Sequence, residues 1–580
     1  MSTNIKNAYM TMYPEHKVPP VDLFDDRLDG ALYTFGILQI IMNEVPVDKR
    51  PIYILFTLDT SISMDELCKD RRSKIHHILK TFEHMVRFIA QHPDSNVTIC
   101  VDIFDTSIDH IIRDTRVSNA NADEIISLVK QIRPRESTDI ELALLNAKDQ
   151  LTKYNTSNPT HKLFHIFLTD GEANHGQTDP KRLVKLIQYD IAQNIFIGYG
   201  TTHNSAMLRK FGETPSSKYL FIDHGENSGA VYGELMQRIM FPALENAEIR
   251  MNVEQSSGEI YDWTSNQWIH TLSIGTIDSG AELTFHVRVK LQSLNIIAHI
   301  IGQGLPVVDV LNNTICEMVE CIPPLVDGDG NVSEMDHSNT IVKYMFRQQT
   351  LELMFKCSHF KGSPVDNKQL KLEMSTFFKQ MRGYMRTSDL ILDPFMRLLC
   401  EDIVTCYKTL GTALGHMYSA ARQGSQGQQT SFTPRYEDNA DNNDENDVLV
   451  DNMPRLQRVN TSCSPRTLPA QPYDEAIDAG SDDDDDDVNQ MPPPPPSLRR
   501  YLSIKNDDTP NDCSPVFDHI ENVDTPTITT TTTTTAHDDY DEDDIDNYVM
   551  ISATNYGFDQ DATVYATPGR LNAIRTMSGR

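Results

Sequence analysis

The sequence predicts an α/β fold with a doubly wound, mostly parallel sheet. Residues 52–58 (Ile-Tyr-Ile-Leu-Phe-Thr-Leu) form a run that is apolar on both faces, as in a strand covered by helices on both sides. From residue 51 to about 245, such runs alternate with segments of helical periodicity. This alternation is typical of βαβ crossovers and therefore of a parallel sheet.

The elements of this Rossmann-like unit can be placed in order. We expect strands at 52–58, 97–104, 110–112, 162–168, 194–199 and 219–222. We expect helices at 65–90, 122–132, 139–154, 180–191, 206–211 and 229–240. In the first helix, Ile75, Ile78, Leu79 and Phe82 follow the spacing of one buried face.

The rest of the chain divides by composition. Residues 1–30 predict an extended leader, and 31–50 a strand that joins a later β domain. Residues 51–245 form the α/β unit, 246–335 alternate as in an antiparallel β-sandwich-like domain, and 336–421 predict a helical hairpin or bundle. Residues 422–580 predict a disordered acidic tail rich in Pro and Thr, because such a composition buries too little apolar surface to fold.

The composition excludes several classes of protein. The net charge is -32 and no basic cluster is present, so a nucleic-acid partner is not expected. The nine cysteines contain no Cys-x-x-Cys pair, which disfavours a disulfide framework or a zinc ribbon. No signal-peptide pattern or stretch of 18 apolar residues occurs, so we expect a soluble, cytoplasmic or otherwise intracellular protein with no membrane partner. The oligomeric state stays open.

Polar side chains follow the strands where the sheet is expected to end. Asp59, Ser61 and Ser63 come after the first strand, Thr138 precedes a helix, and Asp170 follows the strand at 162–168. Ligands bind beyond the carboxyl ends of parallel strands, so these oxygens are expected to meet there. Two acids and three hydroxyls suit a hard cation such as Mg²⁺ or Mn²⁺. The alternative for the first loop is a simple helix cap.

The motifs around these residues resemble a known site. They are Asp-Thr-Ser-Ile-Ser at 59–63, Glu-Ser-Thr-Asp-Ile at 136–140, and Thr-Asp-Gly-Glu at 169–172. Together they resemble the metal-ion-dependent adhesion site (MIDAS) of von Willebrand factor type A (vWA) domains. The resemblance implies one metal-binding set: Asp59, Ser61, Ser63, Thr138 and Asp170, with the three hydroxyls as direct ligands. The family usually has Gly where this chain has Ile62, and often Gly-Gly where it has Glu136 and Ser137.

Other features complete the resemblance. The β and helical segments, over roughly residues 31–430, resemble the region that follows the vWA domain in intracellular proteins. Four residues near the predicted site are candidates for a rim that contacts a partner: Asp105, Glu136, Glu172 and His175. The alternative for Asp105 and His175 is an ordinary loop role.

The function expected is that of a protein-interaction module, in which Mg²⁺ at the MIDAS binds a carboxylate of a partner protein. One alternative is an intracellular scaffold or adaptor that binds mainly through its acidic, Pro-rich tail. A second is a metal-assisted hydrolase that uses the Ser61 hydroxyl. The chain has no His-Glu-x-x-His, no phosphate-binding Gly loop and no nucleophile elbow, so we do not expect an enzyme.

Overall fold

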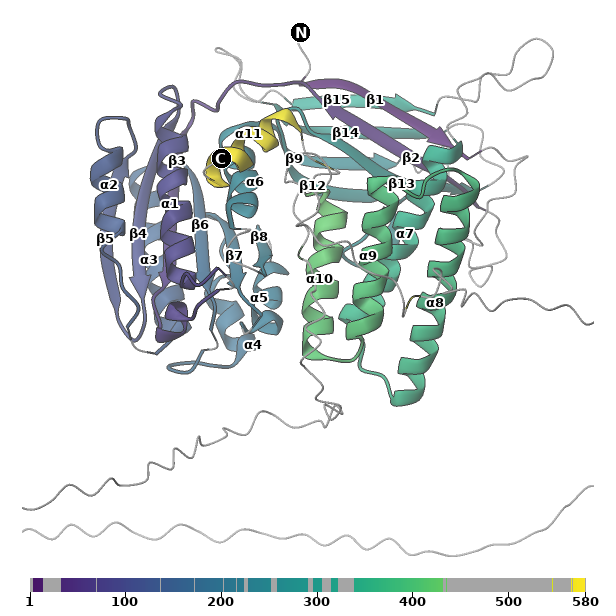
Figure 1. Cartoon of the computed structure of the whole chain (residues 1–580). Coiled ribbons are helices and arrows are strands. Elements are labelled where there is room, and N and C mark those ends of the chain that lie inside the picture. The colour runs from purple at the N-terminus through teal and green to yellow at the C-terminus, as the bar shows by residue number, and fades with distance from the viewer. Residues whose placement is uncertain are drawn as a thin grey trace, which may run out of the picture. The chain divides into compact units, whose positions relative to one another are not determined.

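The computed structural model of the chain confirms the predicted fold class (Figure 1). The residues that it describes are 4–13, 33–68, 70–135, 137–171, 173–201, 203–214, 216–223, 228–251, 258–290, 296–304, 314–321, 338–430, 434, 545, 565 and 567–578. They form a mostly parallel sheet with its helices, two antiparallel sheets and a later group of helices, and the first two strands of the chain belong to one of the antiparallel sheets. Most of the tail predicted to be disordered lies outside the described residues.

The parallel sheet has six strands in the order β5-β4-β3-β6-β7-β8. Their bounds are β3 Pro51–Asp59, β4 Asn96–Phe104, β5 Ile108–Arg116, β6 Lys162–Thr169, β7 Gln193–Tyr199 and β8 Ser217–Ile222. Every neighbouring pair is parallel except β4 and β5, which form an antiparallel edge. The strand order reverses at β3, so the carboxyl ends of β3 and β6 are adjacent at the position where doubly wound sheets bind ligands.

Helices cover both faces of this sheet. They are α1 Lys74–Ala90, α2 Ala122–Val129, α3 Ile140–Ser157, α4 Pro180–Leu183, α5 Ser205–Gly212 and α6 Ser228–Met240, with short 3-10 turns η1 Ile62–Asp65 and η2 Val184–Leu186. In β3, Ile54 and Phe56 share a core with α1 and α6, whereas Tyr53 and Leu55 pack with α3. This alternation explains why residues 52–58 are apolar on both faces.

The first helix starts later than its sequence pattern predicts. Instead of beginning near residue 65, α1 begins at Lys74. The preceding segment folds into a turn in which Leu67 bridges to Ser73 and Arg71 has a φ of 64°. The residues between η1 and Lys74 therefore belong to a loop at the sheet edge and not to the helix.

The antiparallel strands form two sheets in the orders β1-β2-β13-β10-β11 and β12-β9-β14-β15. Their bounds are β1 Ile5–Met12, β2 Tyr33–Met42, β9 Pro242–Met251, β10 Glu259–Asp262, β11 Gln267–Ile269, β12 Thr271–Asp278, β13 Glu282–Lys290, β14 Ile297–Gly304 and β15 Thr314–Glu320. Leu38 and Ile40 of one sheet share a core with Ile249 and Ile300 of the other, which is the packing of a β-sandwich.

The structure corrects the predicted leader. Residues 5–12 form the edge strand β1, which pairs with β2 along its length. Ile5 and Met10 are buried in the sandwich core, so this segment is held by apolar contacts as well as by its ladder of hydrogen bonds.

The helical segment is larger than predicted. It comprises α7 Ser338–Ser358, α8 Pro364–Thr387, α9 Pro394–Thr409 and α10 Ala413–Gln428. Helix α10 continues past the predicted end at residue 421, because its polar side chains have buried partners. Arg422 Nε donates to Asp402 Oδ1 at 2.6 Å, and Gln426 Nε2 donates to Asp402 Oδ2 at 2.8 Å. A low-complexity Gln and Gly run can thus pack as a helix.

A second correction concerns the end of the chain. Helix α11 (Pro568–Ser578) lies in a stretch predicted to be disordered, and it packs beside α6 and α1 (Figure 1). A Cβ atom at Gly233 would lie 2.7 Å from Ile574 Cα, so this glycine permits the close approach. Arg570 forms two buried hydrogen bonds to Asp278, each of 2.7 Å. No helix in the described part of the chain combines the length and apolar character needed to cross a bilayer.

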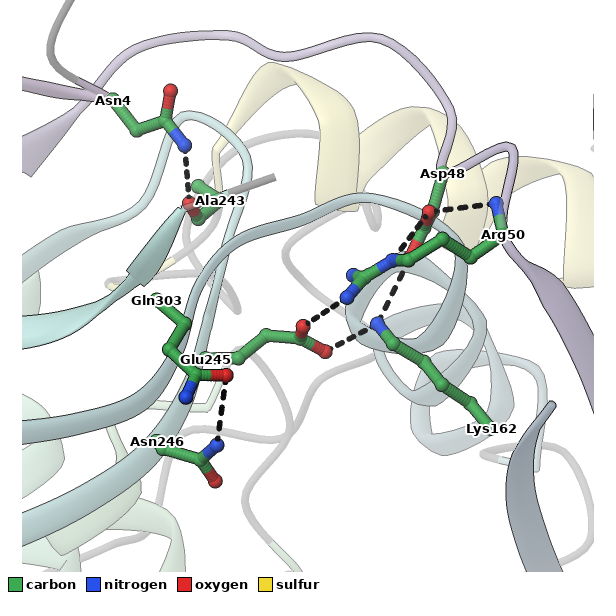
Figure 2. Close-up of polar contacts among 8 residues, drawn as sticks. All are labelled: Asn4, Asp48, Arg50, Lys162, Ala243, Glu245, Asn246 and Gln303. Atoms are coloured by element: carbon green, nitrogen blue, oxygen red, sulfur yellow. Dashed lines mark hydrogen bonds and ion pairs between the residues drawn. The ribbon is translucent and has the colours of Figure 1, made fainter. Parts of the chain in front are cut away.

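The amino end of the parallel sheet is joined to β9 by four charged side chains (Figure 2). Arg50 Nη2 lies 2.6 Å from Asp48 Oδ2, and Arg50 Nη1 lies 2.7 Å from Glu245 Oε2. Lys162 pairs with both acids, at 2.9 Å from Asp48 Oδ2. Two acids and two bases therefore form a charge-balanced junction.

Candidate metal site

The first loop of the candidate site begins where β3 ends. Asp59 is buried, and its Oδ1 accepts a hydrogen bond of 2.8 Å from the Ser61 backbone N–H. Its Oδ2 accepts one of 2.5 Å from Thr169 Oγ1. This Asx turn reverses the chain after the strand and places Ser61 Oγ 3.0 Å from Ser63 Oγ. The loop oxygens are thus turned to one side.

The second loop follows β6. Asp170 is buried, and its Oδ1 accepts a hydrogen bond of 2.7 Å from Ser63 Oγ. Its Oδ2 lies 2.7 Å from the ammonium of Lys74, which also lies 2.6 Å from Glu66 Oε2. Burial lowers the pKa of Lys74, but the carboxylates of Asp170 and Glu66 outweigh burial and raise that pKa. Lys74 is therefore a cation at neutral pH.

The third loop carries Thr138, just before α3. Its backbone N–H donates to Asn174 Oδ1 at 2.8 Å. Its carbonyl accepts hydrogen bonds of 3.2 Å from the backbone N–H groups of Asn174 and His175. These contacts tie the Thr138 loop to the loop that follows β6.

The three loops converge above Gly171. A Cβ atom at Gly171 would lie 3.3 Å from Thr138 Oγ1, 3.8 Å from Ser63 Oγ and 3.9 Å from Asp59 Oδ2. A position without a side chain is thus surrounded by oxygens from three separate segments. The structure brings all five predicted metal-binding residues into one cluster.

The donor set of this cluster fits a hard divalent cation. It consists of carboxylate and hydroxyl oxygens, which Mg²⁺ and Mn²⁺ prefer. In the described part of the chain no group of three His, Cys, Asp or Glu side chains gathers as a metal site. Burial, with a smaller contribution from the Asp170 carboxylate, raises the pKa of Asp59 to about 6. A bound cation would oppose this shift by stabilising both ionised acids.

The four predicted rim residues have different positions. Asp105 is buried, with its carboxylate 2.7 Å from Arg135 Nε and bonded to the Ser107 backbone N–H. It therefore supports the loop and is not part of the exposed rim. His175 is exposed, and its Nδ1 lies 2.9 Å from Oδ2 of Asp139, the residue that caps α3. Glu136 and Glu172 lie outside the described residues.

The sequence did not predict the role of one side chain at the site, Lys74. Lys74 lies within the helix predicted at 65–90, and the sequence alone indicated no role for it. In the structure it is the first residue of α1, and its ammonium lies 2.7 Å from Asp170 Oδ2. Ile62, which stands where the family usually has Gly, is 74% exposed beside the cluster, and Leu67 is 70% exposed.

Among known protein families, curated proteins and solved structures, only solved structures are similar to this chain. No protein-family model matches the sequence, and no curated protein matches it. The structure is similar to that of the ArnB paralog VWA2 from Sulfolobus acidocaldarius, with 14% identity and a TM-score of 0.41 over 73% of this chain and 99% of that chain. It is also similar to a von Willebrand factor type A protein from Catenulispora acidiphila, with 9% identity and a TM-score of 0.42 over 69% of this chain and 90% of that chain.

The similarity to these two structures is one of fold. The strand order and the alternation of strands and helices confirm the doubly wound α/β fold class that the sequence predicted. A smaller part of the chain, 34%, is similar to 47% of the mussel byssus protein PTMP1, with 16% identity and a TM-score of 0.27. That structure has a zinc-occupied MIDAS motif. All these similarities concern the fold, and the first two extend over more of the chain than the α/β unit.

Proposed function

We propose that the vWA domain is a divalent-metal-dependent protein-binding module. In this proposal Mg²⁺ or Mn²⁺ is held by Asp59, Ser61, Ser63, Thr138 and Asp170. When bound, the ion supplies a positive centre that accepts a carboxylate from a partner protein. The observation that carries the proposal is the convergence of oxygens from three loops around Gly171, where a side chain would fill the space.

The charge of the site supports a cation at this position. Asp59 and Asp170 bring two carboxylates into a buried cluster, and Lys74 supplies one positive charge that it shares with Glu66. The cluster is therefore short of positive charge. Buried acids that lack a counter-charge are costly, and a divalent ion would supply it.

The surroundings of the site support binding to another protein. Ile62 and Leu67 are large apolar side chains that lie largely exposed on the loop that carries Ser61 and Ser63. Exposed apolar side chains next to a polar centre are common in interfaces, where apolar contacts surround a specific polar one. We propose that Ile62 packs against the partner beside the metal-bound carboxylate.

We also propose that the site captures a ligand and does not catalyse a reaction. A hydrolase would need a base beside the metal-bound group. The exposed His175 is hydrogen-bonded to the helix-capping Asp139, so it has a structural partner already.

The experiment that tests this proposal compares full-length wild type with Asp59→Asn. Asparagine keeps an acceptor for the Ser61 backbone N–H but removes the charge. Asp149→Asn is the matched control, since Asp149 is an exposed acid on α3 that pairs with Lys153. We expect isothermal titration calorimetry to show one Mg²⁺ or Mn²⁺ bound by wild type and the control, and at least 30-fold weaker binding by Asp59→Asn.

The second arm measures partner capture with the same three proteins. We expect partners that are retained in Mg²⁺, released by EDTA and absent with Asp59→Asn. Capture of the same partners in EDTA, or by Asp59→Asn, would contradict metal-mediated binding.

A further inference from the structure

Lys74 has an unusual position for a lysine. It is the first residue of α1, and its side chain is only 9% exposed. The partial positive charge of a helix N-terminus disfavours a cation there. Burial of an ammonium adds a further penalty. Neither the position at the helix N-terminus nor the burial therefore accounts for a lysine at this place.

The contacts of the ammonium do explain it. Lys74 Nζ lies 2.7 Å from Oδ2 of the buried Asp170 and 2.6 Å from Oε2 of Glu66, whose side chain is more than half exposed. It thus bridges one acid inside the candidate metal cluster and one acid outside it. The other oxygen of Asp170 faces Ser63, so the carboxylate joins the ammonium to the predicted ligands.

A divalent ion and this ammonium would compete for the same carboxylate. Two cations that share one acid repel each other strongly in a buried site, where water screens little. Glu66 offers the ammonium a second partner that does not belong to the predicted metal-binding set. The lysine can therefore release Asp170 while it keeps an ion pair with Glu66.

We propose that Lys74 is an internal counter-cation that holds Asp170 when no divalent ion is bound and that moves toward Glu66 when the ion binds. In this way Lys74 sets the ion concentration at which the site fills. The proposal rests on the proposed metal site and adds its regulation. It predicts opposite effects of changes at Lys74 and at Glu66.

The first test measures Mg²⁺ and Mn²⁺ affinity of the full-length chain by isothermal titration calorimetry. Lys74→Met removes the competing charge and keeps a long apolar stem, so we expect at least tenfold tighter binding than in wild type. Lys80→Met is the matched control, because Lys80 lies on the same helix, is half exposed, and pairs with Glu83, an acid that Arg87 and Lys130 also contact. Its affinity should stay within twofold of wild type.

The second test uses Glu66→Gln, which keeps Lys74 and removes its alternative partner. Displacement of the ammonium then becomes harder, and we expect three- to tenfold weaker metal binding. In the double variant Lys74→Met/Glu66→Gln this weakening should largely disappear, because a double-mutant cycle isolates the coupling between the two residues. An equal loss in both backgrounds would mean that Glu66 acts on the ion directly, which overturns the proposal.

Thermal unfolding provides a readout independent of calorimetry. Without metal, Lys74→Met should melt below wild type, since Asp170 loses its counter-charge. Saturating Mg²⁺ should raise its melting temperature by more than that of wild type.

Equal or weaker metal affinity in Lys74→Met, with wild type still binding the ion, overturns the role of Lys74 and leaves the metal site intact. Absence of binding in every protein overturns the metal site itself.

Discussion

The two ends of the parallel sheet carry contrasting groups of charges. At the amino end, Asp48, Arg50, Lys162 and Glu245 form a closed set of ion pairs (Figure 2). Each acid there contacts both bases, and the charges cancel. This cluster joins the α/β unit to strand β9 of the sandwich.

At the carboxyl end, the buried acids outnumber the cations. Asp59 and Asp170 are enclosed with one ammonium, that of Lys74, which also serves Glu66. The hydroxyls of Ser63 and Thr138 face the same space around Gly171.

The balance of charge therefore distinguishes a structural junction from a binding site on the same sheet. A buried cluster whose charges cancel is complete, and removal of any member leaves another member uncompensated. A cluster that is short of positive charge is complete only when a cation is added. Substitutions of acids at the two ends of the sheet test this contrast.

The largest expected effect on folding is at the amino end. Asp48→Asn leaves Arg50 and Lys162 without their most buried partner, so the free energy of unfolding should fall by about 3 kcal/mol. Asp170→Asn should cost only about 1 kcal/mol, because it removes an acid from a cluster with an excess of acids. Urea denaturation of both variants without metal measures the difference, and equal losses would contradict the contrast.

The pH dependence provides a control for Asp48. Burial alone raises the pKa of Asp48, but hydrogen bonds from Arg50 and the charge of Lys162 outweigh burial and lower it below the ordinary value. An acid with a lowered pKa in the folded state stabilises the protein above its unfolded pKa, and this contribution is lost as the pH falls. The stability gap between wild type and Asp48→Asn should therefore be full at pH 7 and shrink below about pH 4.

The next effect is on metal affinity at the carboxyl end. Asp170→Asn should weaken Mg²⁺ binding at least 100-fold, since one of two carboxylates is lost. Asp48→Asn makes the same chemical change at the opposite end and should leave the affinity within twofold. Calorimetry on both variants checks this, and a similar loss in both would show that metal binding does not depend on the carboxyl-end cluster.

A smaller effect is expected on stability in the presence of metal. At ten times the dissociation constant, Mg²⁺ should stabilise wild type by about 1.4 kcal/mol. Mg²⁺ should raise the free energy of unfolding of Asp48→Asn by the same amount, from a lower value without metal. It should not raise the free energy of unfolding of Asp170→Asn. Urea denaturation with and without Mg²⁺ measures these gains. A gain in Asp170→Asn would place the stabilising ion elsewhere.

The smallest effect concerns the apolar rim. Ile62→Gly introduces the residue that the family usually has and removes a largely exposed side chain. We expect metal affinity within threefold of wild type and partner binding three- to tenfold weaker, because the change removes apolar contact area but no ligand. Surface plasmon resonance with a captured partner tests it. Unchanged partner binding would exclude Ile62 from the interface.

The sequence alone predicts those features that depend on the order of strands and polar residues along the chain. Strand ends in a doubly wound sheet meet at one edge, so the positions of Asp59, Thr138 and Asp170 along the chain predict that they lie near each other. The structure brings them together around Gly171. The alternation of burial in β3 likewise follows from its unbroken apolar run.

Features that depend on distant partners could not be predicted from local patterns. The strand β1 forms because β2 offers a free edge, and α11 packs because Gly229 and Gly233 open the surface of α6. Asp105 was predicted at the rim, but Arg135 and Ser107 enclose its carboxylate. These outcomes depend on which groups meet in space, and composition and periodicity do not report that.

The most direct test of the account is a titration of the metal-free, full-length chain with Mn²⁺, followed by electron paramagnetic resonance. The account predicts one bound Mn²⁺ per chain, competed by Mg²⁺ and lost in Asp59→Asn. A wild-type chain that leaves all Mn²⁺ free in solution, or that binds it equally well after Asp59→Asn, would contradict the claim that the carboxyl-end cluster is a metal site.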